Sequence, residues 1–386
     1  MIYVDYNATT PMDSRVVETV FSCFRSVYGN PSSIQHLIGR QAAEIVEVAR
    51  LNVAKAIGAH PRRVIFTSGA TEAINLAIHG VMYQNSIKTN DKQKHQIMFT
   101  TTEHKAVIEA AKHWGEVFEV ELIEIPVDRH GHISITEFEN LLNDETLLVA
   151  VALANNETGN LHPIAQLARI AKDRGAYFLT DATQGLGKME IDIKMLNCDF
   201  LALSAHKAYG PKGVGALAGA TSVIDYLQAI QGGGGQENGS RGGTLNVPGI
   251  VGFGEACKLI IEQLEGDIAR SLLIRNDFFE KVKFLIPDVQ INGDLDDGLS
   301  NTVNLRFPAT DAEAVMAAMP DVAISTGSAC QSAVPAPSHV LISMGLSHEE
   351  ARECLRFSFG RFSELADNPV LVSKIVSAIN HVRSFN

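Results

Sequence analysis

A lysine beside a tight turn is the first group in this sequence that could do covalent chemistry. Lys207 follows an apolar stretch, residues 199–203, and precedes a Gly-Pro turn and a second apolar stretch, residues 214–218. Two strands that meet at such a turn would hold the lysine at a sheet end, beside buried surroundings. Partial desolvation lowers the pKa of a lysine, and the neutral amine can then form a Schiff base with a carbonyl compound. The alternative is a solvated lysine in a surface turn, and this stretch alone does not decide between the two.

A second stretch has the sequence expected of a phosphate-binding turn. The apolar residues 64–67 are followed by Ser68-Gly69-Ala70-Thr71-Glu72 and then by a helical pattern. A strand, a turn of small residues and a helix N-terminus offer unpaired backbone N–H groups and the positive end of the helix dipole to an anion. The stretch lacks the Gly-Lys-Ser/Thr ending of a Walker A loop. Its alternative interpretation is an ordinary helix start with Glu72 in the first turn.

Three further polar side chains, His104, Asn156 and Asp181, each come soon after an apolar stretch that we assign as a strand. Ligands of open α/β sheets bind at the carboxyl ends of the strands. A carboxylate at the end of an apolar strand, such as Asp181, is partly desolvated and needs a partner. That partner is either a helix N-terminus or the cationic ring nitrogen of a bound ligand. A lone histidine at a strand-to-helix junction more often has a structural role, so each residue is weak evidence by itself.

Strand and helix patterns alternate from residue 64 to about residue 218, which predicts an α/β fold. Such alternation indicates a mostly parallel sheet flanked by helices on both faces. Strands of this kind end at a common sheet edge, so the candidate side chains are expected to lie together. They are Thr71, His104, Asn156, Asp181 and Lys207. From Asp267 onward the pattern changes to helix, strand, strand, helix and strand, which predicts a second, smaller α+β domain.

Three later segments add candidates. The glycine run 232–235 is either a flexible linker or a loop whose backbone approaches a ligand or a second subunit closely. Between residues 325 and 338 there is no aromatic or charged residue, so we expect a mobile loop that exposes Cys330. Arg356 alternates with Leu355 and Phe357, which places it on the opposite face of a strand. A guanidinium held there suits a substrate carboxylate, or it forms an ordinary surface salt bridge.

Composition excludes several classes of protein. The chain has 386 residues, 46% hydrophobic and 20% charged, and a net charge of −12, which argues against direct binding to nucleic acid. We find no apolar stretch of about 18 residues and no signal-peptide pattern, so neither a membrane span nor export is expected. The five cysteines are scattered without a CxxC pair. We therefore expect no metal site and no disulfide framework, and a reducing, cytoplasmic location.

Taken together, these motifs resemble those of the cysteine desulfurases, which are pyridoxal-phosphate enzymes of fold type I in the class V aminotransferase group. The resemblance covers almost the whole chain, and it is the order of many short motifs that makes it specific. They are Asp5-Tyr6-Asn7-Ala8-Thr9-Thr10-Pro11, Tyr28-Gly29-Asn30-Pro31-Ser32-Ser33, Thr67-Ser68-Gly69-Ala70-Thr71-Glu72, Thr102-Glu103-His104-Lys105, Asn155-Asn156-Glu157-Thr158-Gly159, Asp181-Ala182-Thr183-Gln184, Ser204-Ala205-His206-Lys207, Arg241-Gly242-Gly243-Thr244, Gly327-Ser328-Ala329-Cys330 and Arg356-Phe357-Ser358.

The resemblance implies a role for each matching residue. Lys207 would attach the cofactor covalently, Asp181 would pair with its ring nitrogen, and His104 would stack on its ring and assist proton transfer. Asn156 and Gln184 would contact the ring hydroxyl or the substrate, and Arg356 would bind the substrate carboxylate. The phosphate would be held by Gly69, Ala70, Thr71, Ser204 and His206, with Thr244 reaching in from the other subunit of a homodimer. Residues 12–258 would form the large domain, and residues 1–11 and 259–386 the small domain.

The activity implied by the resemblance is removal of sulfur from L-cysteine, which gives L-alanine and a persulfide on Cys330 for an acceptor protein. The pathway of that acceptor stays open between iron–sulfur cluster assembly, tRNA thiolation and DNA phosphorothioation. A selenocysteine lyase or another class V aminotransferase-type enzyme is the main alternative, and it would need no essential cysteine. A non-catalytic scaffold of the same fold is the third possibility. The joint presence of Lys207, Asp181, His104 and Cys330 argues against a scaffold.

Overall fold

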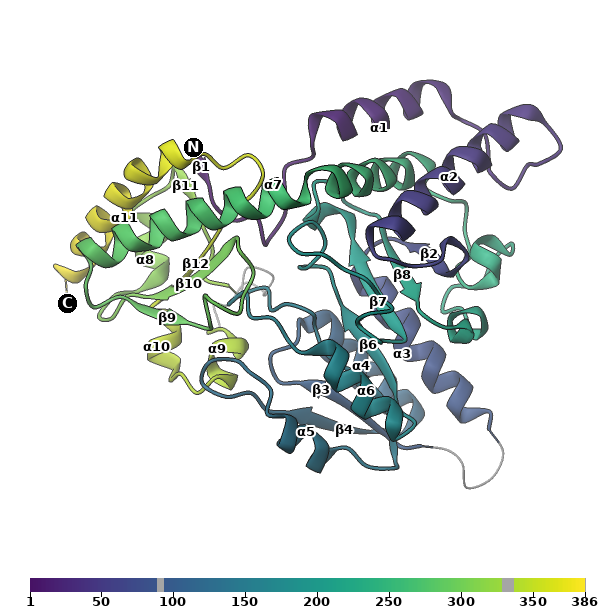
Figure 1. Ribbon diagram of the computed structural model, residues 1–386, viewed down its shortest axis with the longest axis horizontal. Helices are drawn as coiled ribbons and strands as arrows, with labels where there is room; N and C mark the ends of the chain where they lie inside the picture. The colour runs from purple at the N-terminus through teal and green to yellow at the C-terminus, as the bar shows by residue number, and fades with distance from the viewer. Residues whose placement is uncertain (89–93, 328–336, 386) are drawn as a thin grey trace.

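A mostly parallel sheet forms the centre of the larger part of the molecule (Figure 1). The computed structural model describes residues 1–88, 94–327 and 337–385. Within them, β8 alone runs antiparallel to its neighbours in this sheet, and the remaining strands are parallel to one another. In spatial order the strands are β2 (Val64–Thr67), β8 (Gly215–Gly219), β7 (Phe200–Ser204), β6 (Tyr177–Asp181), β5 (Thr146–Ala150), β3 (Gln96–Thr100) and β4 (Glu121–Ile125). The expected α/β fold is confirmed, and the expected stretches 64–67, 199–203 and 214–218 agree with β2, β7 and β8 to within one residue.

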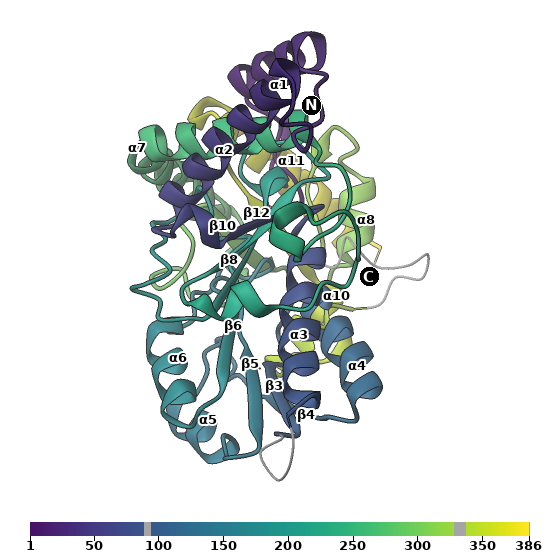
Figure 2. The ribbon, with the colours of Figure 1, turned by 90° about the vertical axis from the view of Figure 1, so that its right-hand side faces the viewer.

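Both faces of this sheet are covered by helices, because its strands are apolar on both sides. Successive residues of a strand point to opposite faces, and Ile65 accordingly packs on one face while Val64 and Phe66 pack on the other. Figure 2 shows helices on either side of the sheet. They are α3 (Ala70–Ser86) and α4 (Lys105–Phe118) on one face, and α5 (Ile135–Leu141) and α6 (Ile164–Asp173) on the other.

A second hydrophobic core lies around a smaller antiparallel sheet. Its strands, in spatial order, are β12 (Cys354–Ser358), β10 (Thr302–Arg306) and β9 (Gln290–Asn292). Next to it, β1 (Ile2–Tyr3) pairs with β11 (Val322–Ala323), so the N-terminus of the chain joins this part of the molecule. The associated helices are α8 (Ala312–Ala317), α9 (His339–Ser343), α10 (His348–Arg352) and α11 (Asn368–Arg383).

One long helix connects the two cores. The sequence predicts a helix over residues 247–264 and a change of composition after Asp267, but α7 continues without a break from Val247 to Leu285. Its first half contributes Phe253 to the core of the large sheet, and its second half contributes Phe278 to the core of the small sheet. Figure 1 shows α7 running across both parts. The expected division after residue 258 therefore falls inside a continuous helix.

The N-terminal region contains a helix that the sequence analysis did not anticipate. Residues before the expected helix at 36–57 read as loops, yet α1 (Ser14–Ser26) forms there and packs against α7. The side chain of Asp13 caps α1 by accepting a hydrogen bond from the Arg15 N–H. The expected helix is confirmed as α2 (Leu37–Ala56). None of the helices in the described part of the chain combines the length and apolar character that a membrane span needs.

A buried ion pair fixes the loop that precedes α7. The guanidinium of Arg50 on α2 makes two parallel hydrogen bonds of 2.8 Å to the carboxylate of Glu237. The same carboxylate accepts the backbone N–H of Phe66 on β2 at 2.7 Å. The Glu237 side chain is 1% exposed, so its charge is almost fully desolvated and depends on these partners. The pair therefore ties α2, β2 and the loop over residues 236–239 together.

We predict that Glu237→Gln lowers the free energy of unfolding by about 3 kcal/mol, because it removes the buried carboxylate partner of Arg50 and leaves, among the described residues, only the exposed carboxylate of Glu47 beside that charge. Urea unfolding followed by circular dichroism measures this loss. Arg169→Gln is the control, since Arg169 and its partner Asp173 are both more than half exposed, and we expect a change below about 0.5 kcal/mol. Equal effects of the two substitutions would contradict the assignment of Glu237 as a structural anchor.

Candidate active site

A cavity of about 930 Å³ opens at the carboxyl ends of the parallel strands. The sequence predicted that polar side chains following several strands would meet at this edge, and the structure brings most of them together. The predicted site residues that line the cavity are Gly69, Ala70, Thr71, His104, Asn156, Asp181, Gln184, Ser204, His206, Lys207 and Arg356. Its volume is in the range of cavities that bind cofactors and small substrates.

One end of the cavity is built to hold an anion. Helix α3 begins at Gly69 without a side-chain cap from the described residues, so its first N–H groups are left for another partner. Gly215 on β8 allows this turn to lie close to the sheet, because a Cβ atom there would lie 2.6 Å from the Cα of Gly69. The imidazole of His206 lies beside this end, with Nδ1 3.1 Å from the Thr9 hydroxyl oxygen. Burial and nearby lysines lower the pKa of His206 to about 4.

Lys207 lies in the connection between β7 and β8, which pair antiparallel as the sequence predicted. Its Nζ donates hydrogen bonds of 2.6 Å to the backbone oxygens of Asn7 and Ala8. These two carbonyls come from the N-terminal segment, which crosses over the edge of the large sheet. The amine is therefore held at the cavity wall by neutral acceptors that a ligand can replace.

His104 and Asp181 come from neighbouring parts of the same sheet edge. His104 caps α4, and its Nδ1 accepts the Ala106 N–H at 3.0 Å. Since a nitrogen that accepts this bond carries no proton, the proton of the neutral ring is on Nε2. Burial lowers the pKa of His104, although Asp181 acts in the opposite direction. Asp181 closes β6, and one of its oxygens accepts the Thr183 N–H at 2.9 Å, while the buried Thr183 hydroxyl has no partner among the described residues.

Arg356 points from the small sheet into the cavity. Leu355 and Phe357 pack in the core of the small sheet, so the expected opposite placement of Arg356 is confirmed. Its guanidinium donates to the carboxylate of Asp5 at 2.6 Å and to the backbone oxygen of Asn156 at 3.0 Å. The buried Arg356 Nε has no partner in the described part of the chain. The guanidinium therefore retains donor capacity for a further anionic ligand.

Two predicted residues are not among those that line the cavity. Cys330 lies outside the described residues, as does most of the expected loop 325–338, but Gly327 and His339, which flank it in the sequence, both line the cavity. Between them, the Ser338 hydroxyl donates at 2.5 Å to Glu157, a carboxyl group whose pKa is raised by burial. Thr244 is exposed. It lies near Arg241, which pairs with Glu72 at 2.8 Å beside the anion-binding turn.

The structure also places residues in or beneath the cavity that sequence reasoning did not select. Asn7 belongs to a motif that the resemblance included, but its role was not assigned. Lys212 follows the Gly-Pro turn in the sequence, a position that predicts a structural role, yet it lines the cavity. Lys188 is buried beneath Gln184 and donates to its side-chain oxygen at 2.5 Å. Asn7 could have been selected from the sequence, because it lies inside a polar motif. No sequence motif marks Lys188.

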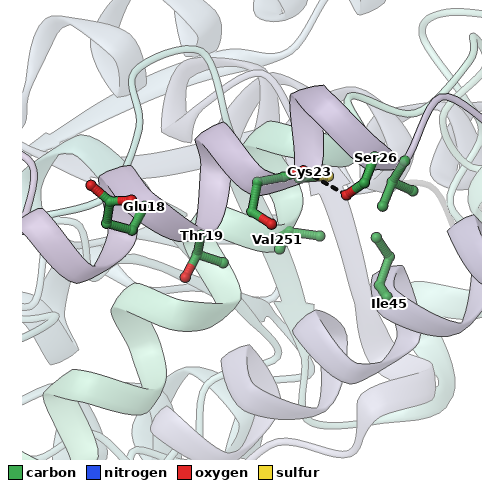
Figure 3. Close-up of a pocket in the computed structure, with 8 residues that line it drawn as sticks. Glu18, Thr19, Cys23, Ser26, Ile45 and Val251 are labelled. Carbon is green, nitrogen blue, oxygen red and sulfur yellow. Dashed lines mark hydrogen bonds between the residues drawn. The ribbon is translucent and has the colours of Figure 1, made fainter.

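A second pocket lies between α1, α2 and α7 (Figure 3). Its lining includes Glu18, Thr19, Cys23 and Ile45, and it is open to the surface. The pKa of Cys23 is raised by burial, so its thiol is not activated. Within the described ranges, no group of three or more His, Cys, Asp or Glu side chains is placed to hold a metal ion. The chemistry of the chain is therefore concentrated in the first cavity.

The first cavity fits pyridoxal phosphate, the cofactor that the resemblance implies. The uncapped start of α3 suits the phosphate group, and Asp181 offers an anion to a protonated ring nitrogen. Lys207 supplies an amine at the wall of the same cavity. The unpartnered Thr183 hydroxyl and Arg356 Nε show that buried donors remain to be satisfied by ligands. The residues present are therefore those that this cofactor requires.

Comparison with known proteins agrees with this geometry. The family model for aminotransferase class-V matches residues 2–368. Cysteine desulfurase IscS of Rickettsia bellii strain OSU 85-389 is 39% identical over 385 residues, which cover 100% of this chain and 92% of the relative. Among solved structures, a NifS-like protein superposes with a TM-score of 0.90 at 32% identity, covering 98% of this chain and 99% of the other. SspA in complex with cysteine superposes with a TM-score of 0.81 at 32% identity, covering 94% and 100%. This chain therefore belongs to the class-V aminotransferase family, as one of its pyridoxal-phosphate-dependent cysteine desulfurases.

Proposed function

We propose that the enzyme attaches pyridoxal phosphate through Lys207 and passes the sulfur of L-cysteine to Cys330 as a persulfide, with L-alanine as the second product. The observation that carries this proposal is that Lys207, His104 and Asp181 converge on one cavity whose far wall holds Arg356. A cysteine-bound neighbour of the same fold supports the class of substrate.

The proposed binding roles follow from the chemistry of each wall. The start of α3 holds the phosphate through Gly69, Ala70 and Thr71, and Ser204 and His206 complete this subsite. Asn156 and Gln184 contact the ring hydroxyl or the substrate. Arg356 binds the substrate carboxylate with the donors that Asp5 and the Asn156 carbonyl leave unused.

When bound, pyridoxal phosphate supplies a ring that stabilises negative charge on the substrate carbon. Asp181 keeps the ring nitrogen protonated, because an adjacent carboxylate favours the charged form of that nitrogen. Lys207 would hold the cofactor through its amine, and the same amine, once free, would accept the proton from Cα of the substrate. His104 is neutral and carries its remaining proton on Nε2, so it can donate a hydrogen bond within the cavity and assist proton transfer.

The sulfur transfer conserves atoms and electrons without an external oxidant. The thiolate of Cys330 attacks the substrate sulfur, and a sulfur–sulfur bond forms as the bond between sulfur and Cβ breaks. The electron pair of the broken bond stays on carbon, Cβ takes up one proton, the proton removed from Cα is returned, and the product leaves as L-alanine. Cys330 keeps the transferred sulfur as a persulfide, which a thiol of an acceptor protein can then attack.

We further propose that the enzyme is a homodimer in which Thr244 completes the phosphate subsite of the partner. Large apolar side chains lie exposed along one side of α1 and just after it. They are Val17, Phe21, Phe24 and Tyr28. Exposed fractions of 69% for Phe24 and 78% for Tyr28 are costly on a monomer surface and favour a second copy of the chain as the cover. Thr244 is exposed and near the Arg241–Glu72 pair, which supports a contribution to a neighbouring subunit.

Three broader features belong to the same proposal. Residues 12–258 form the large domain, and residues 1–11 and 259–386 the small one, supported by two separate hydrophobic cores. A cytoplasmic location is supported by four free cysteines, Cys23, Cys198, Cys257 and Cys354, since disulfides are rare in reducing compartments. The relatives named IscS support a protein acceptor in iron–sulfur cluster assembly.

We predict that Lys207→Ala abolishes covalent attachment of the cofactor. Borohydride reduction followed by peptide mass spectrometry detects the attachment at residue 207 in the wild type and none in the variant. L-Alanine formation from L-cysteine falls by about a thousandfold or more, because the variant lacks the amine that attaches the cofactor and takes the proton. Lys194→Ala is the control on an exposed lysine outside the cavity. A Lys207→Ala enzyme with wild-type turnover would exclude the proposed role.

We predict that Cys330→Ala lowers L-alanine formation from L-cysteine by about a hundredfold or more, while cofactor attachment at Lys207 is unchanged. The wild type treated with L-cysteine gains the mass of one sulfur atom on the peptide that contains Cys330. Cys354→Ala serves as the control, because Cys354 is a buried thiol whose pKa is raised to about 12. Full turnover by Cys330→Ala would instead favour the alternative of a selenocysteine lyase or another class V aminotransferase-type enzyme.

We predict that two inactive variants restore activity when they share a dimer. Lys207→Ala removes the amine, and Thr244→Asp places a negative charge against the phosphate of the neighbouring site. In a mixed dimer purified by two different tags, one site carries both defects and the other is intact, so about half of the wild-type activity returns. The control mixes Lys207→Ala with Asp181→Ala, because each subunit supplies both of these residues to its own site. Each site of this mixed dimer then carries one defect, and the dimer stays inactive. No recovery in the first mixture would exclude Thr244 from the partner's site.

A further inference from the structure

A second lysine lies buried beneath the candidate active site. Lys188 follows β6 in the sequence and is 8% exposed. Its Nζ donates hydrogen bonds to the side-chain oxygens of Gln184 at 2.5 Å and of Asn7 at 3.0 Å. Both acceptors are neutral amides, and none of the ion pairs among the described residues includes Lys188. A buried amine without a carboxylate partner is uncommon in proteins and calls for a function.

The surroundings of Lys188 favour its neutral form. Burial lowers its pKa well below the usual range, and the nearby charges of Lys207 and Arg356 lower it further. A neutral amine has two N–H donors, and Lys188 uses one on Gln184 and one on Asn7. The two amides therefore accept both N–H donors of the amine. The contacts of Lys188 depend on the orientation of these amides and not on a counter-charge.

The contact with Lys188 decides which way the Gln184 amide faces. The Lys188 amine donates to the Gln184 side-chain oxygen, so this oxygen is the atom that faces Lys188. One Nε2 proton of Gln184 then goes to the backbone oxygen of Asn7 at 3.0 Å. The second Nε2 proton is the polar capacity that Gln184 has left for a ligand in the cavity that it lines. Without Lys188, the hydrogen bond to the Asn7 backbone oxygen would be the one contact within the described residues that still holds the amide in this orientation.

Asn7 transmits the same constraint to the nucleophilic lysine. Its side-chain oxygen accepts from Lys188 and from Asn301, while its side-chain nitrogen donates to Thr302 and to the Asn156 carbonyl. The backbone oxygen of this residue accepts from both Gln184 and Lys207. Lys188 thus supports the carbonyl on which the Lys207 amine rests.

We propose that Lys188 is a positioning residue that fixes Gln184 and Asn7, so that Gln184 presents an N–H donor to the ring oxygen of pyridoxal phosphate. This inference rests on the proposed function, because it takes Lys207 as the residue that attaches the cofactor. Lys188 itself touches neither cofactor nor substrate and acts only through its two amide neighbours, Gln184 and Asn7.

The test measures cofactor binding rather than turnover. Lys188→Met keeps the length of the side chain and removes its donors. We expect the dissociation constant of the apoprotein for pyridoxal phosphate to rise about tenfold, as for the loss of one well-formed hydrogen bond. The visible absorption maximum of the bound cofactor also shifts, because its ring oxygen loses a donor. An unchanged dissociation constant and an unchanged maximum overturn the inference.

Lys94→Met is the matched control. Among the described residues Lys94 also donates to neutral oxygens, the carbonyls of Thr146, Arg174 and Gly175, but it does not line the cavity. Loss of either lysine is expected to lower the thermal unfolding temperature. Only Lys188→Met is expected to change the dissociation constant and the absorption maximum. Equal changes in both variants would mean that the effect is one of general stability, and would overturn the inference.

A double-mutant cycle tests the route of action. If Lys188 acts through Gln184, then Lys188→Met adds little to the effect of Gln184→Ala on the dissociation constant. Fully additive effects overturn the inference. Should Lys188→Met fail to fold, Gln184→Glu carries the test, since it keeps the shape of the side chain but replaces the N–H donor by a carboxylate. We expect the same tenfold loss, and wild-type binding by this variant would show that Gln184 does not act as a donor.

The outcome also separates this inference from the proposed function. Covalent attachment that persists in Lys207→Ala means that the proposed function fails. Attachment that is lost in Lys207→Ala, together with wild-type binding and absorption in Lys188→Met, means that only the role of Lys188 fails.

Discussion

A single buried amide at Asn7 holds three distant segments of the chain in one arrangement. The residue is 1% exposed, so each of its polar atoms must find a partner inside the protein. Its backbone N–H donates to Ser358 on the small sheet, its side chain accepts from Lys188 below the large sheet, and its carbonyl accepts from Lys207. Hydrogen bonds that converge on the N-terminal segment therefore act together with α7 to hold the two sheets in place. The active-site cavity is the space that these bonds leave between the sheets.

Much of this arrangement could be predicted because it depends on local rules. Parallel strands end at one sheet edge, so a polar residue directly after an apolar strand is placed before any tertiary contact is known. This reasoning located Asp181 at the end of β6 and His104 at the start of α4. The alternation of side chains within one strand was also sufficient to place Arg356 on the opposite face of the strand from the apolar Leu355 and Phe357. In each case, the information lies within a few residues of the site.

The residues that were missed depend on contacts between positions far apart in the sequence. Asn7 and Lys188 form a hydrogen bond although 181 positions separate them. Neither the hydrophobic periodicity nor the turn residues of either segment predict this contact. The helix α1 was missed for a related reason, because the loop-forming residues on both sides of it are a stronger local signal than its own pattern. The length of α7 follows from two separate cores that each use one half of it, and a change of composition along the chain was mistaken for a change of element.

The charges around the cavity explain why an acidic protein binds an anionic cofactor. The chain carries a net charge of −12, yet Lys188, Lys207 and Lys212 all act on His206, and together with burial they lower its pKa to about 4. Lys207 and Lys212 line the cavity together with His206, so they place positive charge close to its anion-binding end. Like charges that lie close together repel one another, which costs stability. A phosphate bound at the start of α3 would supply negative charge there and recover part of that cost. A ligand that binds the native state stabilises that state. The charges that attract the phosphate of the cofactor therefore also make the stability of the folded site depend on the bound cofactor.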